Sequence, residues 1–204
     1  TADEFVPVVQ GLRAEHGHDA MDPQRIRASV SNGARALVSL GLDINEDAPE
    51  FESKRLRLLE LYSQVVGTMA SPYPGIESLL ARLQAKGIVW GISTNKPRAY
   101  TEPLLARLNI QPPPGSVVCP DDITNRKPHP ESLYRNCHDL HCAPHEAIYI
   151  GDHLRDIEAG RRAGMYTIAA AYGYIEENDD PQGWGANAQA LSSQDLFELI
   201  LGTQ

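Results

Sequence analysis

The fold of this chain is decided by the stretch Ile150-Gly151-Asp152-His153-Leu154-Arg155-Asp156. A short apolar run ends here in a glycine and a carboxylate, and a second carboxylate follows four positions later. The pattern predicts a buried strand that carries Asp152 at its carboxyl end and a helix that carries Asp156 in its first turn. In open α/β sheets, ligands bind beyond the carboxyl ends of the strands. The alternative is an Asp152 that only caps the helix and an Asp156 on its solvated face.

Two carboxylates at the end of one strand form a hard, oxygen-rich site. Mg²⁺ usually binds one or two protein carboxylates together with waters and a phosphate. We therefore predict Mg²⁺ as the cofactor, with Asp152 as its ligand and Asp156 as the second acidic group.

Two segments upstream place phosphate-binding groups after predicted strands. Gly87–Pro97 is an apolar run that ends in hydroxyls and an amide, and the polar loop Cys119–Pro130 holds Lys127 between turn residues. A hydroxyl donates to a phosphate oxygen, and a lysine supplies a compact positive charge. Together with carboxylates on a metal, these groups form a coherent phosphoryl-transfer site.

The composition limits the class of protein and its partners. The length of 204 residues suits one α/β domain with a small additional unit, and the net charge of −9 disfavours nucleic acid and anionic membranes as partners. No apolar run approaches the roughly 18 residues of a membrane span. Three cysteines without a framework spacing favour a reducing cytoplasm. We expect a small-molecule substrate and a monomer or homodimer.

The apolar pattern divides the chain into a helical part, residues 1–72, and an alternating α/β part, residues 73–204. Helices are predicted over Glu4–His16, Pro23–Leu40, Phe51–Val66, Ile76–Lys86, Arg98–Leu108, Glu131–Leu140, Leu154–Ala163 and Ser193–Leu201. Strands are predicted over Ile88–Ser93, Ser116–Cys119, Ala147–Gly151 and Tyr166–Ala171, and a loop over Glu176–Gly185. Strands that alternate with helices predict a Rossmann-like, doubly wound parallel sheet.

Three of these segments resemble motifs of the haloacid dehalogenase-like (HAD) phosphohydrolases. Thr94 in Ile92-Ser93-Thr94-Asn95-Lys96 matches the second motif, Lys127 matches the third, and Gly151-Asp152 with Asp156 matches the fourth. Their order and separations fit, and the resemblance covers essentially all 204 residues. The whole pattern looks most like phosphoglycolate phosphatases and their relatives that act on N-acetylmuramate 6-phosphate. The helical part then corresponds to the cap and the rest to the HAD-like core.

The first motif of the family is absent from this sequence. In the family, Asp-x-Asp-Gly-Thr on the first strand supplies the nucleophile and the general acid/base, and no Asp-x-Asp occurs here. Thr1–Phe5 resembles the segment that follows that motif. We therefore expect that the first strand, which lies between the strands ending at Thr94 and Gly151, is missing. The chain alone is expected to be inactive, and a stable fold would be surprising because two strand edges stay unpaired.

The resemblance also implies roles for individual residues. Lys127 neutralises the phosphate and orients the nucleophile, Thr94 binds the phosphate, and Asn95 supports the phosphate or the substrate. Asp156 joins Lys127 and Thr94 as a catalytic residue. In the cap, the segment that faces the active site corresponds to the polar residues Ser31, Asn32 and Arg35, which are candidates for binding the leaving group. The same segment is equally compatible with a helix junction.

The function implied by the resemblance is a Mg²⁺-dependent phosphomonoesterase. An aspartate would attack phosphorus to form an aspartyl-phosphate, which water then hydrolyses. Phosphoglycolate is the first expected substrate and N-acetylmuramate 6-phosphate the second. A sugar-phosphate mutase and a non-catalytic protein that binds a phosphorylated ligand remain alternatives. A response-regulator receiver is disfavoured, since such a domain is shorter and lacks a helical insertion.

Overall fold

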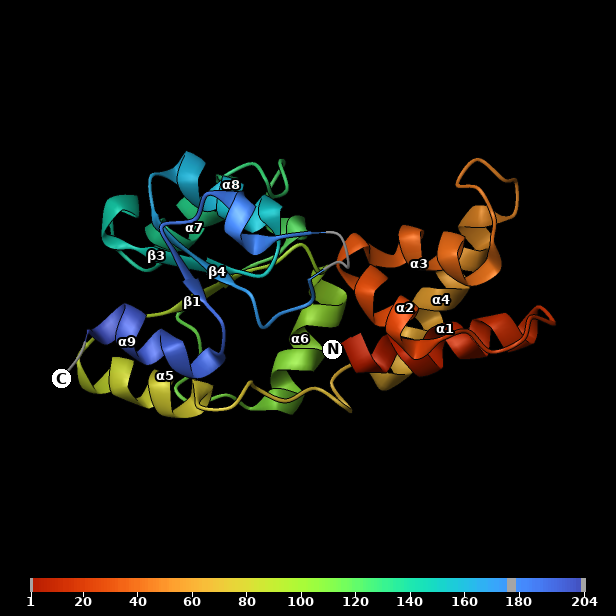
Figure 1. The fold of residues 1–204 in the computed structure, drawn as a ribbon, viewed down its shortest axis with the longest axis horizontal. Coiled ribbons are helices and arrows are strands. Elements are labelled where there is room, and N and C mark those ends of the chain that lie inside the picture. Colours follow the sequence, from red (N-terminus) through yellow and green to blue (C-terminus); the bar gives the residue numbers. More distant parts are fainter. Residues whose placement is uncertain (1, 176–178, 203–204) are drawn as a thin grey trace. The chain divides into compact units, whose positions relative to one another are not determined.

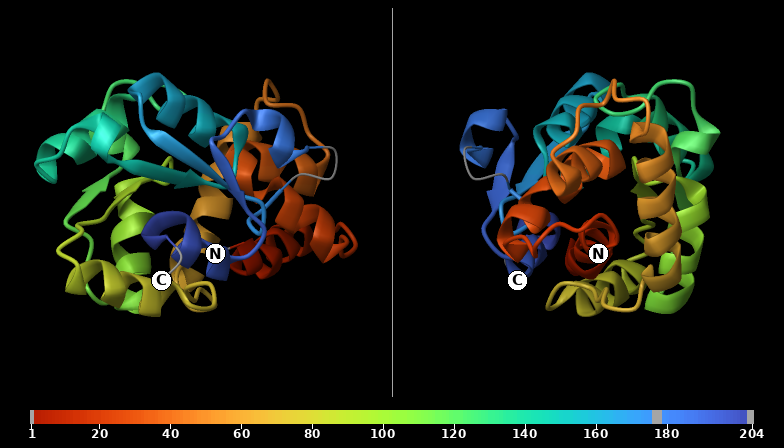
Figure 2. Two further views of the ribbon diagram at one scale, coloured as in Figure 1. Left: turned by 60° about the vertical axis from the view of Figure 1, so that its left-hand side comes forward. Right: turned by 90° about the vertical axis from the view of Figure 1, so that its right-hand side faces the viewer.

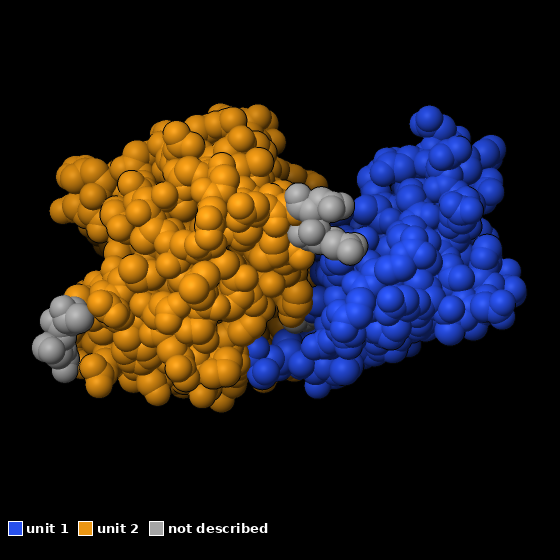
Figure 3. Space-filling view, in the orientation of Figure 1, with its two compact units in different colours: residues 1–71 blue, residues 72–204 orange. Residues whose placement is uncertain are grey.

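The computed structural model describes residues 2–175 and 179–202, which divide between two units (Figures 1 and 3). The first unit is residues 1–71 and the second is residues 72–204. Among the described helices, none has the length and apolar character needed to cross a membrane.

The first unit consists of helices, most of which bury apolar side chains. They are α1 (Ala2–Glu15), α2 (Pro23–Ser29), the short 3₁₀ helix η1 (Val30–Asn32), α3 (Gly33–Leu42) and α4 (Phe51–Val65). On α1, helical spacing places Phe5, Val9 and Leu12 on one buried face. Phe5 stacks on Tyr62 of α4, with 4.1 Å between the ring centroids. The predicted ends of α1 and α4 are within two residues of those observed.

The single helix predicted over Pro23–Leu40 is wrong, because the chain breaks it at residues 30–32. Asp22 caps α2 by accepting a hydrogen bond from the backbone N–H of Gln24, at 2.9 Å. After α2 the chain tightens into η1, and Gly33 then has a φ of 82°. A glycine adopts this left-handed conformation without steric cost, so Gly33 lets a new helix begin in another direction.

The second unit is built from parallel strands and the helices between them. The strands are β1 (Gly91–Ser93), β2 (Ser116–Val118), β3 (Ile148–Gly151), β4 (Tyr166–Ala170) and β5 (Ala188–Ala190). The helices are α5 (Ile76–Ala85), α6 (Arg98–Leu108), α7 (Glu131–Asp139), α8 (Leu154–Ala163) and α9 (Leu196–Leu201), with 3₁₀ helices η2 (Pro120–Asp122), η3 (Pro144–Glu146), η4 (Pro181–Trp184) and η5 (Ser193–Asp195). Every strand pair is parallel, as the alternation of elements predicts.

Helices cover both faces of the β3–β4–β5 sheet. On one face, leucines of α5 and Leu196 of α9 pack with Ile168 of β4. On the other, Leu133 of α7 and Ala159 of α8 form a second cluster. Figures 1 and 2 show α5 and α9 on the opposite side of the strands from α7 and α8. This is the doubly wound, Rossmann-like arrangement that the sequence predicts.

Within the described residues the strands form two separate sheets, β1–β2 and β3–β4–β5. Ile148 at the start of β3 is 38% exposed, and Val89, two residues before β1, is 58% exposed. The strand predicted over Ile88–Ser93 starts only at Gly91, because β1 has ladder partners only opposite Ser116–Val118. Three residues of the predicted strand therefore lie outside it.

Other boundaries differ by one or two residues at the ends of elements, and β5 and the 3₁₀ helices η2, η3 and η4 were not predicted. β5 has the sequence Ala-Gln-Ala, which lacks the β-branched and aromatic residues that signal a strand. The last predicted helix is split into η5 and α9. The loop predicted over Glu176–Gly185 contains η4, and its residues 176–178 lie outside the described part of the chain.

Candidate active site

A buried ion pair joins Lys127 to Asp156. The ammonium Nζ lies 2.7 Å from Asp156 Oδ1, and each side chain is only 9% exposed. Asp156 lies in the first turn of α8, where a carboxylate is stabilised by the positive end of the helix. Lys127 reaches it from the polar loop that follows β2. Removing either partner from such a buried pair would leave a charge without compensation.

All three donors of the Lys127 ammonium have partners in this structure. Besides Asp156, Nζ donates to the carbonyl oxygen of Ser93 at 3.0 Å and to the hydroxyl of Tyr149 at 2.9 Å. Burial alone would lower the pKa of Lys127, but Tyr149 and Asp156 outweigh it and hold the pKa above its ordinary value. Lys127 is therefore a fixed positive charge.

Tyr149 is a member of this cluster that the sequence analysis missed. Its hydroxyl lies between Lys127 and Asp156, and it donates to Asp156 Oδ1 at 3.3 Å. Burial raises the pKa of Tyr149, against the influence of the neighbouring Lys127. Strand alternation was the available signal, since Tyr149 and Gly151 lie two residues apart on one face of β3.

Gly151 permits the close approach of α8 to the end of β3. A Cβ atom on Gly151 would lie 2.2 Å from Cβ and 2.7 Å from Cγ of Asp156. Any other residue here would push Asp156 away from Lys127. A glycine is therefore required at position 151 for steric reasons.

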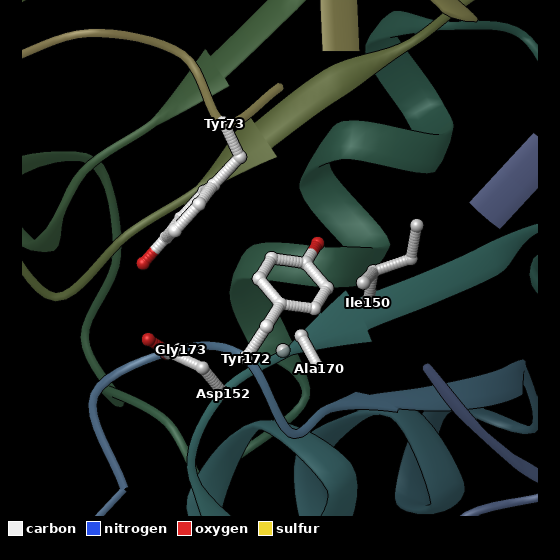
Figure 4. Close-up of a pocket in the computed structure, with 7 residues that line it drawn as sticks. Tyr73, Ile150, Asp152, Ala170, Tyr172 and Gly173 are labelled. Atoms are coloured by element: carbon white, nitrogen blue, oxygen red, sulfur yellow. The ribbon is translucent and has the colours of Figure 1, made fainter. Parts of the chain in front are cut away.

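Asp152 lies in a different environment, at a pocket of about 190 Å³ (Figure 4). The pocket is lined by Tyr73, Ile150, Gly151, Asp152, Ala170, Tyr172 and Gly173. The rings of Tyr73 and Tyr172 meet edge to face, with 4.9 Å between their centroids. Burial raises the pKa of both tyrosines, so both hydroxyls stay protonated near neutral pH. Asp152 Oδ2 accepts a hydrogen bond from the backbone N–H of Tyr174 at 3.2 Å.

The predicted phosphate-binding residues after β1 lie beside the Lys127 loop. Thr94 Oγ1 accepts from the backbone N–H of Lys96 at 3.0 Å, whereas Ser93 Oγ donates to Ser132 Oγ on α7 at 2.7 Å. The amide Nδ2 of Asn95 donates to the carbonyl oxygen of Lys127 at 3.4 Å. Asn95 Oδ1 is buried and has no hydrogen-bond partner within the described residues. The structure thus brings Asn95 and Ser93 together with Lys127.

The three cap candidates belong to the helical unit. Ser31 and Asn32 lie in η1, and Arg35 lies in the first turn of α3. The Arg35 guanidinium pairs with Glu46 at 2.7 Å and lies 5.0 Å from the centre of the Phe51 ring. In this structure Arg35 is therefore engaged within its own unit.

Of the two carboxylates at the site, only Asp152 is available to bind a cation. The described residues contain no group of three or more His, Cys, Asp or Glu side chains arranged to hold a metal ion. Asp156 is engaged by Lys127, which leaves Asp152 at the pocket. One protein carboxylate fits Mg²⁺, which completes its octahedron with waters and phosphate oxygens. It does not fit a closed structural zinc site, which takes four protein ligands.

The chain is similar to known phosphatases in sequence and in fold. Residues 1–170 match the haloacid dehalogenase-like hydrolase family. The chain is 40% identical to N-acetylmuramic acid 6-phosphate phosphatase of Pseudomonas aeruginosa, over 98% of this chain and 88% of the relative. It is 33% identical to phosphoglycolate phosphatase of Xanthomonas campestris, over 97% of this chain and 89% of the relative. A crystal structure of a predicted phosphoglycolate phosphatase from Haemophilus somnus superimposes with a TM-score of 0.83 at 20% identity, covering 96% and 90% of the two chains.

Proposed function

Because the chain belongs to the haloacid dehalogenase-like hydrolase family, we propose that it hydrolyses small phosphomonoesters at the site around Lys127 and Asp152. The buried ion pair of Lys127 carries this proposal. A lysine held at 9% side-chain exposure, with its pKa raised, supplies a permanent positive charge where water is scarce. Such a charge is most effective at stabilising a transferring phosphoryl group.

The contacts of Lys127 indicate how it would bind a phosphoryl oxygen. Its three donors are already used, so an incoming oxygen must replace one acceptor. The neutral acceptors, the Ser93 carbonyl and the Tyr149 hydroxyl, bind more weakly than the Asp156 carboxylate. One of these two is therefore exchanged, and Asp156 keeps the lysine in place. The hydroxyl of Thr94 and the amide of Asn95 would complete the cradle on the β1 side.

Asp152 is the residue that would hold Mg²⁺. Mg²⁺ held by Asp152 would supply positive charge to neutralise the phosphoryl oxygens. Asp152 fits this role because it lies at a pocket and its Oδ2 is already oriented by the Tyr174 N–H. Asp156 would act through Lys127 and not as a direct ligand.

The nucleophile of this mechanism lies outside residues 1–204, which contain no Asp-x-Asp sequence. We propose that it lies on a strand that fills the gap between β1 and β3. The separation of the two sheets and the exposure of Ile148 support this placement. Residues 1–204 alone are accordingly expected to release no phosphate from any phosphomonoester.

N-acetylmuramate 6-phosphate becomes the first substrate to test and phosphoglycolate the second. The sequence alone favours the opposite order. The chain is, however, 40% identical to an N-acetylmuramic acid 6-phosphate phosphatase and 33% identical to a phosphoglycolate phosphatase, which favours the former substrate. Ser31, Asn32 and Arg35 of the helical unit are the proposed leaving-group residues. A substrate carboxylate would compete with Glu46 for Arg35. The free thiols Cys119, Cys137 and Cys142 fit the proposed cytoplasmic location.

The test is phosphate release by the full-length protein with Mg²⁺ and each of the two substrates. Lys127→Met is expected to lower kcat/KM on the order of 10²- to 10³-fold, as removal of one charge-stabilising donor does elsewhere. Lys86→Met, at an exposed lysine, is the matched control and should leave it unchanged. An isomeric sugar phosphate without phosphate release would identify a mutase. Unchanged turnover in Lys127→Met would contradict the proposed site.

A further inference from the structure

The turn after β4, Tyr172-Gly173-Tyr174, packs directly against Asp152. Asp152 Oδ2 accepts from the Tyr174 N–H at 3.2 Å, and Figure 4 shows Gly173 beside Asp152 at the pocket. A Cβ atom on Gly173 would lie 2.3 Å from Asp152 Cβ, 2.6 Å from Oδ2 and 2.9 Å from Cγ. These distances are far below van der Waals contact. The turn can therefore approach the carboxylate this closely only because residue 173 is a glycine without a side chain.

The clash cannot be relieved by a rotamer change alone. The nearest atom to the added Cβ is the Cβ of Asp152, whose position is set by the backbone at the end of β3. Either the end of β3 or the turn would have to move by several tenths of an ångström or more. In both cases the Tyr174 N–H would lose its distance and angle to Oδ2, since hydrogen bonds weaken steeply with misalignment.

The turn is anchored by bonds that do not involve Asp152. Gly173 N–H donates to the Ala170 carbonyl at 3.0 Å, and Ala171 N–H donates to Ala190 of β5 at 2.9 Å. The Tyr172 ring is held edge to face by Tyr73. Because the turn is fixed to the sheet, it can act as a rigid support for the carboxylate.

We propose that Gly173 and Tyr174 are positioning residues that hold Asp152 in the orientation needed to bind a divalent cation. Gly173 acts by having no side chain, and Tyr174 acts through its backbone N–H. The inference rests on the proposed role of Asp152 in binding Mg²⁺. It adds a second segment, about 20 residues further along the chain, to the machinery of the metal site.

The direct test is a titration of the full-length protein with Mn²⁺, in which the electron paramagnetic resonance signal of the free ion measures how much Mn²⁺ is bound. Gly173→Ala is expected to weaken Mn²⁺ binding on the order of 10- to 100-fold, as loss of a supporting contact does at other metal sites. Gly183→Ala is the matched control, since a Cβ there would meet nothing within 4 Å. Its Mn²⁺ affinity should equal that of the unchanged protein.

Asp152→Asn separates failure of this inference from failure of the proposed metal site. If Asp152→Asn weakens binding and Gly173→Ala does not, the positioning role is overturned while the metal site stands. If neither substitution changes Mn²⁺ binding, Asp152 is not the ligand and both proposals fail.

A stability measurement covers the case in which Gly173→Ala does not fold. The steric contact is with the Asp152 side chain, so Gly173→Ala should be less harmful in an Asp152→Gly background. Rescue of folding or of the urea midpoint in the double variant is the expected result. Equal destabilisation in both backgrounds would show that Gly173 serves the turn alone, which overturns the inference.

Discussion

Asp152 and Asp156 are four residues apart, yet the structure places them in opposite environments. Asp156 is 6% exposed and bonded to both Lys127 and Tyr149, on the face of the sheet that α7 and α8 cover. Asp152 lines a pocket and has a backbone N–H on one oxygen. The difference teaches that one short segment supplies two carboxylates for two tasks. The buried one orients a lysine, and the one at the pocket is available to a cation.

The largest expected effect comes from neutralising each carboxylate in turn. Asp156→Asn leaves the ammonium of Lys127 without its counter-charge at 9% exposure, which should lower the free energy of unfolding by about 3–5 kcal/mol. Asp152→Asn removes a charge that has no ion-pair partner among the described residues. It should change the free energy of unfolding by less than about 0.5 kcal/mol. Urea denaturation of both variants measures the difference. Equal losses would mean that the two carboxylates are not specialised as the structure indicates.

Gly151→Ala tests whether the close packing of Asp156 against the end of β3 requires a glycine. The new Cβ would lie 2.2 Å from Asp156 Cβ, so the start of α8 must shift away from β3. Overpacking of this kind costs about 1–3 kcal/mol. The urea midpoint of Gly151→Ala should therefore fall well below that of Gly183→Ala, where no atom lies within 4 Å. A fall of similar size in both variants would point to loss of chain flexibility in place of a clash with Asp156.

Tyr149→Phe removes only the hydroxyl that bridges the pair. One donor of Lys127 then lacks its acceptor, and Asp156 loses a hydrogen bond of 3.3 Å. The expected loss is about 1–2 kcal/mol, since the ring still packs against the cluster around Ala159. Tyr134→Phe is the matched control, because that hydroxyl bonds to the Arg162 carbonyl on the surface. If the two variants lose the same stability, the bridge adds nothing beyond a surface hydrogen bond.

The sequence allowed the parallel sheet and the carboxyl-end location of the site to be predicted. Both follow from patterns within a few residues of one another: an apolar run that ends in Gly151-Asp152, and a helix start at Leu154. The pairing of Lys127 with Asp156 was implied only through the family resemblance. Its distance of 2.7 Å depends on how α8 packs against the loop after β2, which no local pattern encodes.

The missed residues share one property, since each acts across a large separation in sequence. Tyr149 reaches Lys127 across 22 positions, and Tyr174 reaches Asp152 across another 22. Gly173 looks like an ordinary turn glycine in the sequence, and only the neighbouring Asp152 shows why a side chain is excluded. The contact between Tyr174 and Asp152 needs the register of β3 and β4, which pairs Gly151 with Ala169. Single-sequence patterns predict elements better than they predict the pairing between them.

The smallest expected effect concerns pH and asks whether Lys127 stays charged. The folded-state pKa of Lys127 is raised above its unfolded value of about 10.4. Its contribution to stability is therefore fully present below about pH 10.4 and is lost only as pH rises through the folded-state pKa.

Lys127→Met should accordingly cost the same free energy of unfolding at pH 6, 7.5 and 9. The measurement is a urea series at each pH, with Lys86→Met as the exposed control. If burial outweighed Asp156 and Tyr149 instead, the folded-state pKa of Lys127 would lie below its unfolded value. The penalty of Lys127→Met would then grow by up to about 1.4 kcal/mol per pH unit between the two pKa values, because only the unfolded chain would still bind the proton. If the stability loss of Lys127→Met does not change with pH, Asp156 keeps the lysine ionised. Holding a buried lysine in its charged form is the property that separates Asp156 from Asp152.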